Sequence, residues 1–217
     1  MKFVVKTFEG LEEILCSELK EKGFLSPKPL RRAVSFIGKI EDLYKANYTL
    51  SLGLRILQQI SYSKVENEKQ FYDYLLQIPW HRYFTVEKSF RVDVLLLTER
   101  FRNSLFLAQK AKDAIVDRFR KELGERPIVD TRKPHVVINI HITDFEVTVS
   151  LDSSGETLNR RGYRTFQGLA PLNEVLARGI LRLSGWNPDT PLFDPMCGSG
   201  TIAIEATYEA NRIPSGY

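Results

Sequence analysis

The stretch Leu192-Phe193-Asp194-Pro195-Met196-Cys197-Gly198-Ser199-Gly200-Thr201-Ile202-Ala203-Ile204-Glu205-Ala206 decides the expected fold of this chain. Pro191-Leu192-Phe193 reads as the end of a short buried strand, and Thr201–Ala210 as the helix that follows. Between them, Gly198 and Gly200 lack a Cβ, which lets the backbone turn tightly and approach a ligand. Amide groups at the start of a helix attract anionic groups. A strand, a glycine turn and a helix, with an acidic residue beside the turn, predict a nucleotide-type site.

Three interpretations of this pattern are possible: two known glycine-rich binding loops, and a turn that has only a structural role. The phosphate-binding loop requires a lysine after its last glycine, and no lysine follows Gly200. The dinucleotide fingerprint is formally met by Gly198, Gly200 and Ala203. Asp194 and Pro195, just before the turn, belong to a different and longer pattern.

That longer pattern, D-P-x-C-G-S-G-T followed by I-E-A, resembles motif I of the class I S-adenosylmethionine-dependent methyltransferases. More narrowly, it resembles the THUMP-domain RNA methyltransferases, which include enzymes for guanine-N2 of large-subunit rRNA and tRNA. Some members carry the label N6-adenine-specific DNA methylase. The resemblance extends through residues 151–164 and 170–174. It implies S-adenosyl-L-methionine as the cofactor, held by Glu174, Asp194, Pro195, Cys197, Gly198, Ser199, Gly200 and Thr201.

The same resemblance implies an α+β chain built from three parts. Residues 1–53 correspond to an N-terminal ferredoxin-like domain and residues 54–152 to a THUMP domain, which binds RNA in this family. Residues 153–165 are the expected linker. Residues 166–217 correspond to the beginning of an α/β Rossmann-like methyltransferase domain.

Hydrophobic periodicity predicts elements that agree with this layout. Strands are expected at Lys2–Lys6, Ala33–Ile37, Arg55–Ser61, Phe90–Leu97, Val136–Ile142 and Phe145–Leu151. Helices are expected at Phe8–Lys22, Glu41–Leu52, Glu68–Ile78, Ser104–Leu123 and Pro171–Leu183. Thr7 is the expected cap of the first helix, and Gly23 and Gly124 are expected helix ends.

Basic residues concentrate in one segment of a chain whose net charge is only +4. The segment Arg100–Lys133 contains ten Lys and Arg but five Asp and Glu. The later segment Arg160-Arg161-Gly162-Tyr163-Arg164 could hold phosphates and stack a base, or tie the linker to its two neighbouring domains. We expect a mixed role there. The residues predicted to contact RNA are Lys110, Arg120, Lys121, Arg132, Lys133, Arg160, Arg161 and Arg164.

Other features of the sequence point to ordinary roles. No run approaches 18 apolar residues, and the N-terminus lacks the pattern of a signal peptide. Cys16 and Cys197 are far apart and outside any CxxC motif, which fits reduced thiols and a cytoplasmic location. Cys197 as a nucleophile is the weaker reading, because its small size suits the turn. His81, His135 and His141 lack metal-ligand spacing, so no metal is expected.

Two features of the family are not found in this sequence. An acidic residue for the cofactor's ribose is expected about 20 residues after the glycine turn, at or beyond Tyr217. The Asn/Asp-Pro-Pro-Tyr-like catalytic motif is also missing, so the catalytic residues are expected beyond Tyr217. We therefore expect a piece of a longer enzyme that is inactive alone and binds the cofactor weakly or not at all. Residues after about 165 are expected to pack poorly or to rest on a neighbouring chain.

These observations support one function and leave two alternatives open. The parent protein is expected to be an S-adenosylmethionine-dependent RNA methyltransferase, acting on guanine N2 in structured rRNA or tRNA. One alternative is an RNA-binding module without catalysis. The other is an adenine-N6 nucleic-acid methylase, which shares the cofactor site but does not explain a THUMP-like front half.

Overall fold

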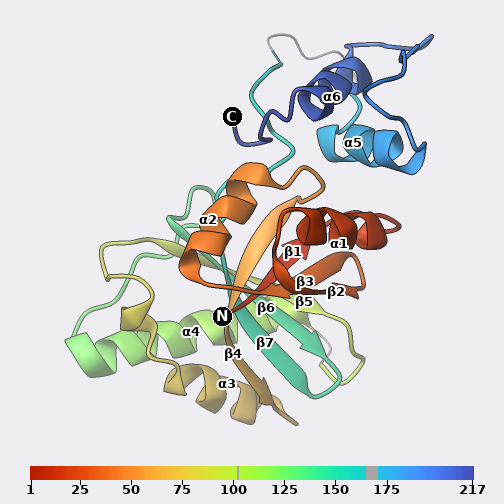
Figure 1. Cartoon of the computed structure of the whole chain (residues 1–217). Helices are drawn as coiled ribbons and strands as arrows, with labels where there is room; N and C mark the ends of the chain where they lie inside the picture. Colours follow the sequence, from red (N-terminus) through yellow and green to blue (C-terminus); the bar gives the residue numbers. More distant parts are fainter. Residues whose placement is uncertain (102, 165–170) are drawn as a thin grey trace. The chain divides into compact units, whose positions relative to one another are not determined.

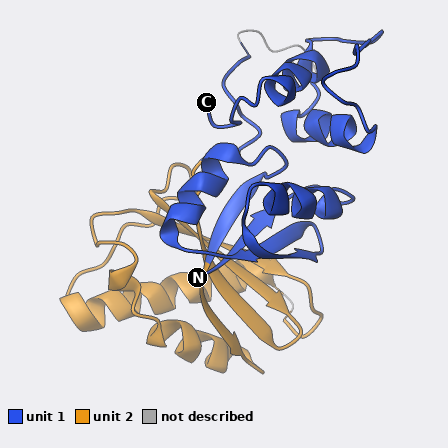
Figure 2. Cartoon of the chain, in the orientation of Figure 1, with its two compact units in different colours: residues 1–58, 156–217 blue, residues 59–155 orange. Residues whose placement is uncertain are grey.

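The computed structural model describes residues 1–101, 103–164 and 171–217. Thr165 of the expected linker, and Ala170 of the motif that precedes Glu174, lie outside the described residues. The chain forms two compact units, coloured separately in Figure 2. Residues 1–58 and 156–217 make up unit 1, and residues 59–155 make up unit 2.

The first part of unit 1 is an antiparallel sheet covered by two helices (Figure 1). Its strands lie in the order β2-β3-β1-β4, and residues Arg55 to Gln58 of β4 pair with β1. The elements are β1 (Lys2–Lys6), α1 (Glu12–Glu21), β2 (Leu25–Leu30), β3 (Ala33–Ile37), α2 (Ile40–Thr49) and β4 (Arg55–Lys64). Alternate residues of the strands, such as Phe3 and Val5, are fully buried with Leu15 and Leu19 of α1. This is the ferredoxin-like layout that the sequence predicts.

Two local predictions in this part are wrong. Helix α1 begins at Glu12 rather than Phe8, and Thr7 does not cap it, because the Thr7 hydroxyl donates to the Leu52 carbonyl (2.7 Å). Strand β2 was not expected, since it contains Pro27 and Pro29. It lies at the edge of the sheet, where a missing proline N–H breaks no ladder on the outer side.

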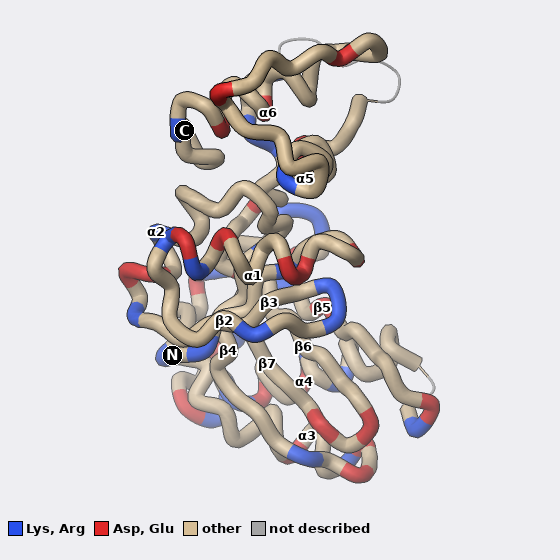
Figure 3. The backbone as a smooth tube through the Cα atoms, turned by 45° about the vertical axis from the view of Figure 1, so that its right-hand side comes forward, with Lys and Arg blue, Asp and Glu red and all other residues tan. Residues whose placement is uncertain are grey.

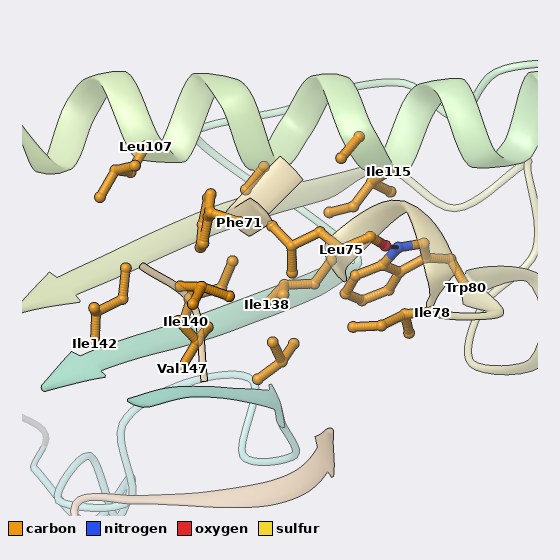
Figure 4. Packing of buried hydrophobic residues seen from close by; sticks show 14 of the residues in the cluster. Phe71, Leu75, Ile78, Trp80, Leu107, Ile115, Ile138, Ile140, Ile142 and Val147 are labelled. Carbon is orange, nitrogen blue, oxygen red and sulfur yellow. Dashed lines mark hydrogen bonds between the residues drawn. The ribbon is translucent and has the colours of Figure 1, made fainter. Parts of the chain in front are cut away.

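Unit 2 places two helices over a sheet in which β4 neighbours β7, in the order β4-β7-β6-β5. Strands β5 and β6 are parallel and are joined through α4, whereas β6 and β7 form the predicted antiparallel hairpin. The elements are α3 (Glu68–Gln77), the 3-10 helix η1 (Trp80–Arg82), β5 (Phe90–Leu96), α4 (Ser104–Leu123), β6 (Val136–Thr143) and β7 (Glu146–Asp152). Their apolar faces meet in one core, part of which Figure 4 shows.

Local sequence signals set the limits of α4 as predicted. The Asn103 side chain accepts a hydrogen bond from the Phe106 amide (3.0 Å), which satisfies one free donor of the first turn. Gly124 ends the helix with φ of 73°, a left-handed conformation that costs a glycine little. In the hairpin, Asp144 also has a positive φ of 51° at the turn. Helix α4 and the hairpin therefore follow directly from sequence.

The last part of unit 1 contains α5 (Glu174–Leu183) and α6 (Thr201–Ala210), which pack against each other. Helix α5 begins at Glu174 instead of Pro171, because the Asn173 side chain accepts from the amides of residues 175 and 176. The expected strand end at 191–193 is not formed: these residues are irregular, and Phe193 is 85% exposed. A strand needs a partner for its backbone, and the described residues beside it provide none. Packing is thus uneven across residues 171–217: α5 and α6 contact each other, whereas the segment at 191–193 is exposed.

We expect the core of unit 2 to depend strongly on Leu107 and hardly at all on Leu105. These leucines lie two positions apart on α4, and their exposed fractions are 1% and 68%. Leu107→Ala should lower the free energy of unfolding by about 2–5 kcal/mol, and Leu105→Ala by less than about 0.5 kcal/mol. Urea unfolding followed by circular dichroism measures both. Equal losses in the two variants would contradict the placement of this helix.

Candidate cofactor-binding turn

The glycine turn before α6 is open on the side where a Cβ would point. Gly198 and Gly200 have φ of 52° and 75°, and no atom lies within 4 Å of a Cβ built on either residue. The Gly200 amide closes the turn on the Cys197 carbonyl (2.7 Å). Asp194 shapes the approach by accepting a hydrogen bond from the Met196 amide (3.0 Å). A substituted side chain would strain this backbone and fill the open side.

The turn leads directly into the positive end of α6. Gly200 is the cap residue of this helix, and no side chain caps its amides. The first amide bonded back along the helix is that of Ile204, which donates to the Gly200 carbonyl (2.9 Å). The amides of the first turn thus have no partner within the helix and can donate to an anionic ligand.

Arg164 holds three separate segments of the site together. Its Nε donates to Glu174 Oε1 (2.7 Å) at the start of α5. Its Nη2 donates to the Thr201 hydroxyl (3.1 Å) and the Leu172 carbonyl (2.5 Å), and its Nη1 to the Ser199 hydroxyl (3.4 Å). The Arg164 side chain is 12% exposed and that of Glu174 is 9% exposed. The structure therefore brings together Glu174, Ser199 and Thr201, which were expected to hold the cofactor, around an arginine that was expected to bind RNA.

A second arginine of the linker is buried behind the turn. Arg161 Nε lies 3.1 Å from Glu205 Oε1 on α6, and Arg178 Nε on α5 donates to Glu205 Oε2 (3.0 Å). The Glu205 side chain is 0% exposed, and that of Arg161 is 1% exposed. The Tyr163 hydroxyl also donates to Glu205 (3.1 Å). One carboxylate thereby joins the linker, α5 and α6.

The ion pairs continue outward into the ferredoxin-like part of unit 1. Arg161 Nη2 donates to the Ser51 carbonyl (2.7 Å). The amide and hydroxyl of Ser51 in turn donate to the buried Glu18 carboxylate. On the other side, Glu209 contacts both Arg178 and Arg182, and Arg182 Nη1 donates to Glu21 of α1 (2.8 Å). Helix α6 is therefore fixed to the N-terminal elements by charge-assisted hydrogen bonds.

Burial and the charge of Glu205 shift the pKa of two groups in this cluster, Arg161 and Tyr163. Burial lowers the pKa of the Arg161 guanidinium from its usual value, while the adjacent Glu205 carboxylate opposes that change. Burial, followed by the charge of Glu205 and the hydrogen bond to it, raises the pKa of the Tyr163 hydroxyl. The hydroxyl thus stays a donor to Glu205 across the physiological pH range.

These contacts correct part of the RNA-binding prediction. The buried Arg161 side chain cannot reach a nucleic acid in this conformation, and Arg164 is committed to the turn. Both arginines instead tie the linker to its neighbours, which is the alternative that the sequence left open. Arg160 is different: its side chain is 72% exposed and only loosely paired with Glu156 at 3.8 Å.

Sequence reasoning missed Glu205, Arg178 and their partners, although a signal was present. Arg178 and Arg182 are four residues apart on α5, and Glu205 and Glu209 are four residues apart on α6. Residues at this spacing share one helix face, so two complementary faces could have been matched. The spacing could not show that Arg161, from the linker, also contacts Glu205.

The basic residues predicted in unit 2 remain on its surface. Lys110 lies 3.6 Å from Glu68, and Arg120 lies 3.4 Å from Asp117. Lys121 is exposed at the end of α4. Arg132 and Lys133 occupy an exposed loop whose backbone amides donate to Asp130. Figure 3 shows Lys and Arg positions interspersed with Asp and Glu positions along the backbone.

The described residues offer few features of any other kind of site. No group of three or more His, Cys, Asp or Glu among them is placed to hold a metal ion. None of the helices in the described ranges is long and apolar enough to cross a membrane. Cys16 is buried and Cys197 exposed, and neither forms a disulfide.

We expect Glu205 to be essential for the stability of unit 1. Glu205→Gln keeps the shape but leaves the buried guanidinium groups of Arg161 and Arg178 without their shared countercharge, which should cost about 3–5 kcal/mol of unfolding free energy. Glu156→Gln, at an exposed pair, should cost less than about 0.5 kcal/mol. Denaturant unfolding measures both. A Glu205→Gln protein as stable as the control would show that the cluster does not hold α6 in place.

Three family models match successive parts of the chain. An RlmL ferredoxin-like domain matches residues 2–57, a THUMP domain residues 65–152, and an RMKL-like methyltransferase domain residues 161–217. A Psychromonas ingrahamii protein named ribosomal RNA large subunit methyltransferase K/L is 41% identical over 216 residues. That match covers 100% of this chain but 29% of the relative. The chain thus spans less than a third of that relative's length.

Two solved structures extend the comparison to three dimensions. A structure described as "a predicted N6-adenine-specific DNA methylase from Listeria monocytogenes" is 29% identical, with a TM-score of 0.89 over 99% of this chain and 56% of that one. Another, "a putative methyltransferase complexed with SAH", is 27% identical, with a TM-score of 0.86 over 99% and 57%. These likenesses confirm the predicted α+β architecture. The chain therefore carries a ferredoxin-like domain, a THUMP domain and part of an RMKL-like methyltransferase domain.

Proposed function

We propose that this chain belongs to an S-adenosylmethionine-dependent methyltransferase that acts on guanine N2 of ribosomal RNA. The observation that carries the proposal is the open glycine turn at the amino end of α6, held by Arg164 and Glu174 in the same chain as a THUMP domain. The name of the Psychromonas relative supports ribosomal RNA over transfer RNA as the substrate. We propose a cytoplasmic location, which fits a ribosomal RNA substrate.

The residues of the turn fit the amino-acid end of the cofactor. The open side of Gly198 and Gly200 leaves room for a ligand against the backbone. The free amides at the start of α6 suit its carboxylate, and Glu174 supports the site through its ion pair with Arg164. When bound, S-adenosylmethionine supplies an electrophilic methyl group on a sulfonium. Asp194, Pro195, Cys197, Ser199 and Thr201 shape the same turn, and their role in holding the cofactor is part of this proposal.

The RNA is held, in this proposal, by basic residues at the surface rather than by the buried linker arginines. Lys110, Arg120, Lys121, Arg132 and Lys133 in unit 2 and Arg160 in the linker supply cations for phosphates. A guanine inside a helix cannot reach a cofactor, so the target base must be flipped out or lie in a loop. Positioning the base and the methyl donor together accounts for much of the expected acceleration. A neighbouring chain that covers part of residues 171–217 remains a prediction.

The test of this function is methyl transfer by the full-length protein that contains this chain. We expect radiolabel from S-adenosylmethionine to enter large-subunit rRNA, and nucleoside mass spectrometry to identify N2-methylguanine. Incorporation into DNA, or N6-methyladenine as the product, would favour the adenine-methylase alternative instead. Tight rRNA binding with no transfer to any substrate would leave only an RNA-binding module.

We expect the affinity for RNA to fall steeply with salt because phosphates dominate the contacts. Four phosphate contacts would weaken binding by about 50- to 150-fold between about 50 and 200 mM salt. Replacing exposed Lys121 and Arg132 with alanine should reduce both the affinity and the salt slope, whereas Arg161→Lys should leave the slope unchanged. Filter binding with an rRNA fragment measures these values. A flat salt response would remove the claim of phosphate contact.

A further inference from the structure

One N–H group of the Arg164 guanidinium forms no hydrogen bond to the described residues. It is on Nη1, the nitrogen that faces Ser199 in the glycine turn. A guanidinium carries five N–H donors. Four hydrogen bonds to described residues are formed, to Glu174, Leu172, Ser199 and Thr201. Nη1 makes only one of them, the contact to the Ser199 hydroxyl, which at 3.4 Å is the longest. The side of Arg164 that faces Ser199 is therefore the least committed.

We propose that Arg164 binds the carboxylate of the cofactor's amino-acid end, with Glu174 as the residue that positions its guanidinium. This inference rests on the proposed function, since it assigns a ligand group to the same turn. It also moves Arg164 from the set of RNA-binding residues to the cofactor site. Within the linker, only the exposed Arg160 keeps an RNA-binding role.

The charges and burial around Arg164 support this assignment. A partner with a full negative charge would replace the weak hydroxyl contact by a charge-assisted bond, which is about twice as strong. The low exposure of Arg164 and Glu174 strengthens such a bond, because little water competes for either group. The amino end of α6, reached through Thr201, adds further positive potential at the same place. Glu174 fixes the guanidinium through Nε and leaves Nη1 directed at the turn.

The assignment predicts which part of a ligand Arg164 binds. S-adenosylhomocysteine has an amino-acid end with a carboxylate, whereas 5′-methylthioadenosine has the same adenosine and thioether without that end. A residue that binds the carboxylate must therefore distinguish these two ligands. A residue that only braces the turn must affect both ligands alike.

Isothermal titration calorimetry with the full-length protein tests this inference with both ligands. We expect Arg164→Gln to raise the Kd of S-adenosylhomocysteine by about 10- to 100-fold, the effect of one charge-assisted hydrogen bond, and that of 5′-methylthioadenosine by less than about threefold. Arg164→Lys should recover part of the lost affinity, because it restores the charge without the planar fork. The matched control is Arg160→Gln, four positions earlier and exposed, which should change neither Kd.

Each outcome of the titration separates the inference from the proposed function. If the unmodified protein binds neither ligand, the cofactor site itself is wrong and both proposals fall. If it binds S-adenosylhomocysteine but Arg164→Gln weakens both ligands equally, or weakens neither, the proposed function stands and the carboxylate assignment is overturned. The same discrimination in Arg160→Gln would also overturn it. A thermal melt of each variant without ligand shows whether an equal loss comes from a destabilised turn.

Discussion

The carboxylate of Glu205 is buried between the guanidinium groups of Arg161 and Arg178, and the position of the candidate site depends on it. A buried charge is stable only with a partner, so these three side chains permit few other arrangements of α5, α6 and the linker. Helix α6 carries the glycine turn at its amino end. Arg161 continues the connection to Ser51, in the ferredoxin-like part of unit 1. The geometry of the turn is thus set by residues that do not line it.

Arginines of one short segment serve different purposes in this structure, and burial separates them. Arg160 is exposed and free to meet a polyanion, Arg161 is a buried structural cation, and Arg164 faces the turn. Spaced within five residues, the three look alike in the sequence, where their charge suggests RNA. In the fold, this segment instead connects α5 and α6 and supports the glycine turn. The surface cations of unit 2 and Arg160 are then the residues that we propose for RNA contact.

Much of the fold could be predicted because its signals are local. Asn103 and Gly124 define α4 within a few residues, and the hydrophobic alternation around Asp144 defines the hairpin. The glycine turn was also predicted, since its pattern is contiguous. Strand β2 was missed because its pairing with β3 outweighs the low strand propensity of two prolines. The strand expected before the turn did not form, because strand pairing depends on residues far away in sequence. The contact of Arg164 with Ser199 spans 35 positions and that of Tyr163 with Glu205 spans 42, which no local pattern reveals.

A crystal structure of the full-length protein with S-adenosylhomocysteine is the most direct test of this account. It should show the amino-acid end of the ligand against the turn at 197–201, with its carboxylate on Arg164, while Glu205 remains buried between Arg161 and Arg178. A ligand bound elsewhere, or a turn whose glycines are closed off in a core with Arg164 directed to solvent, would contradict it.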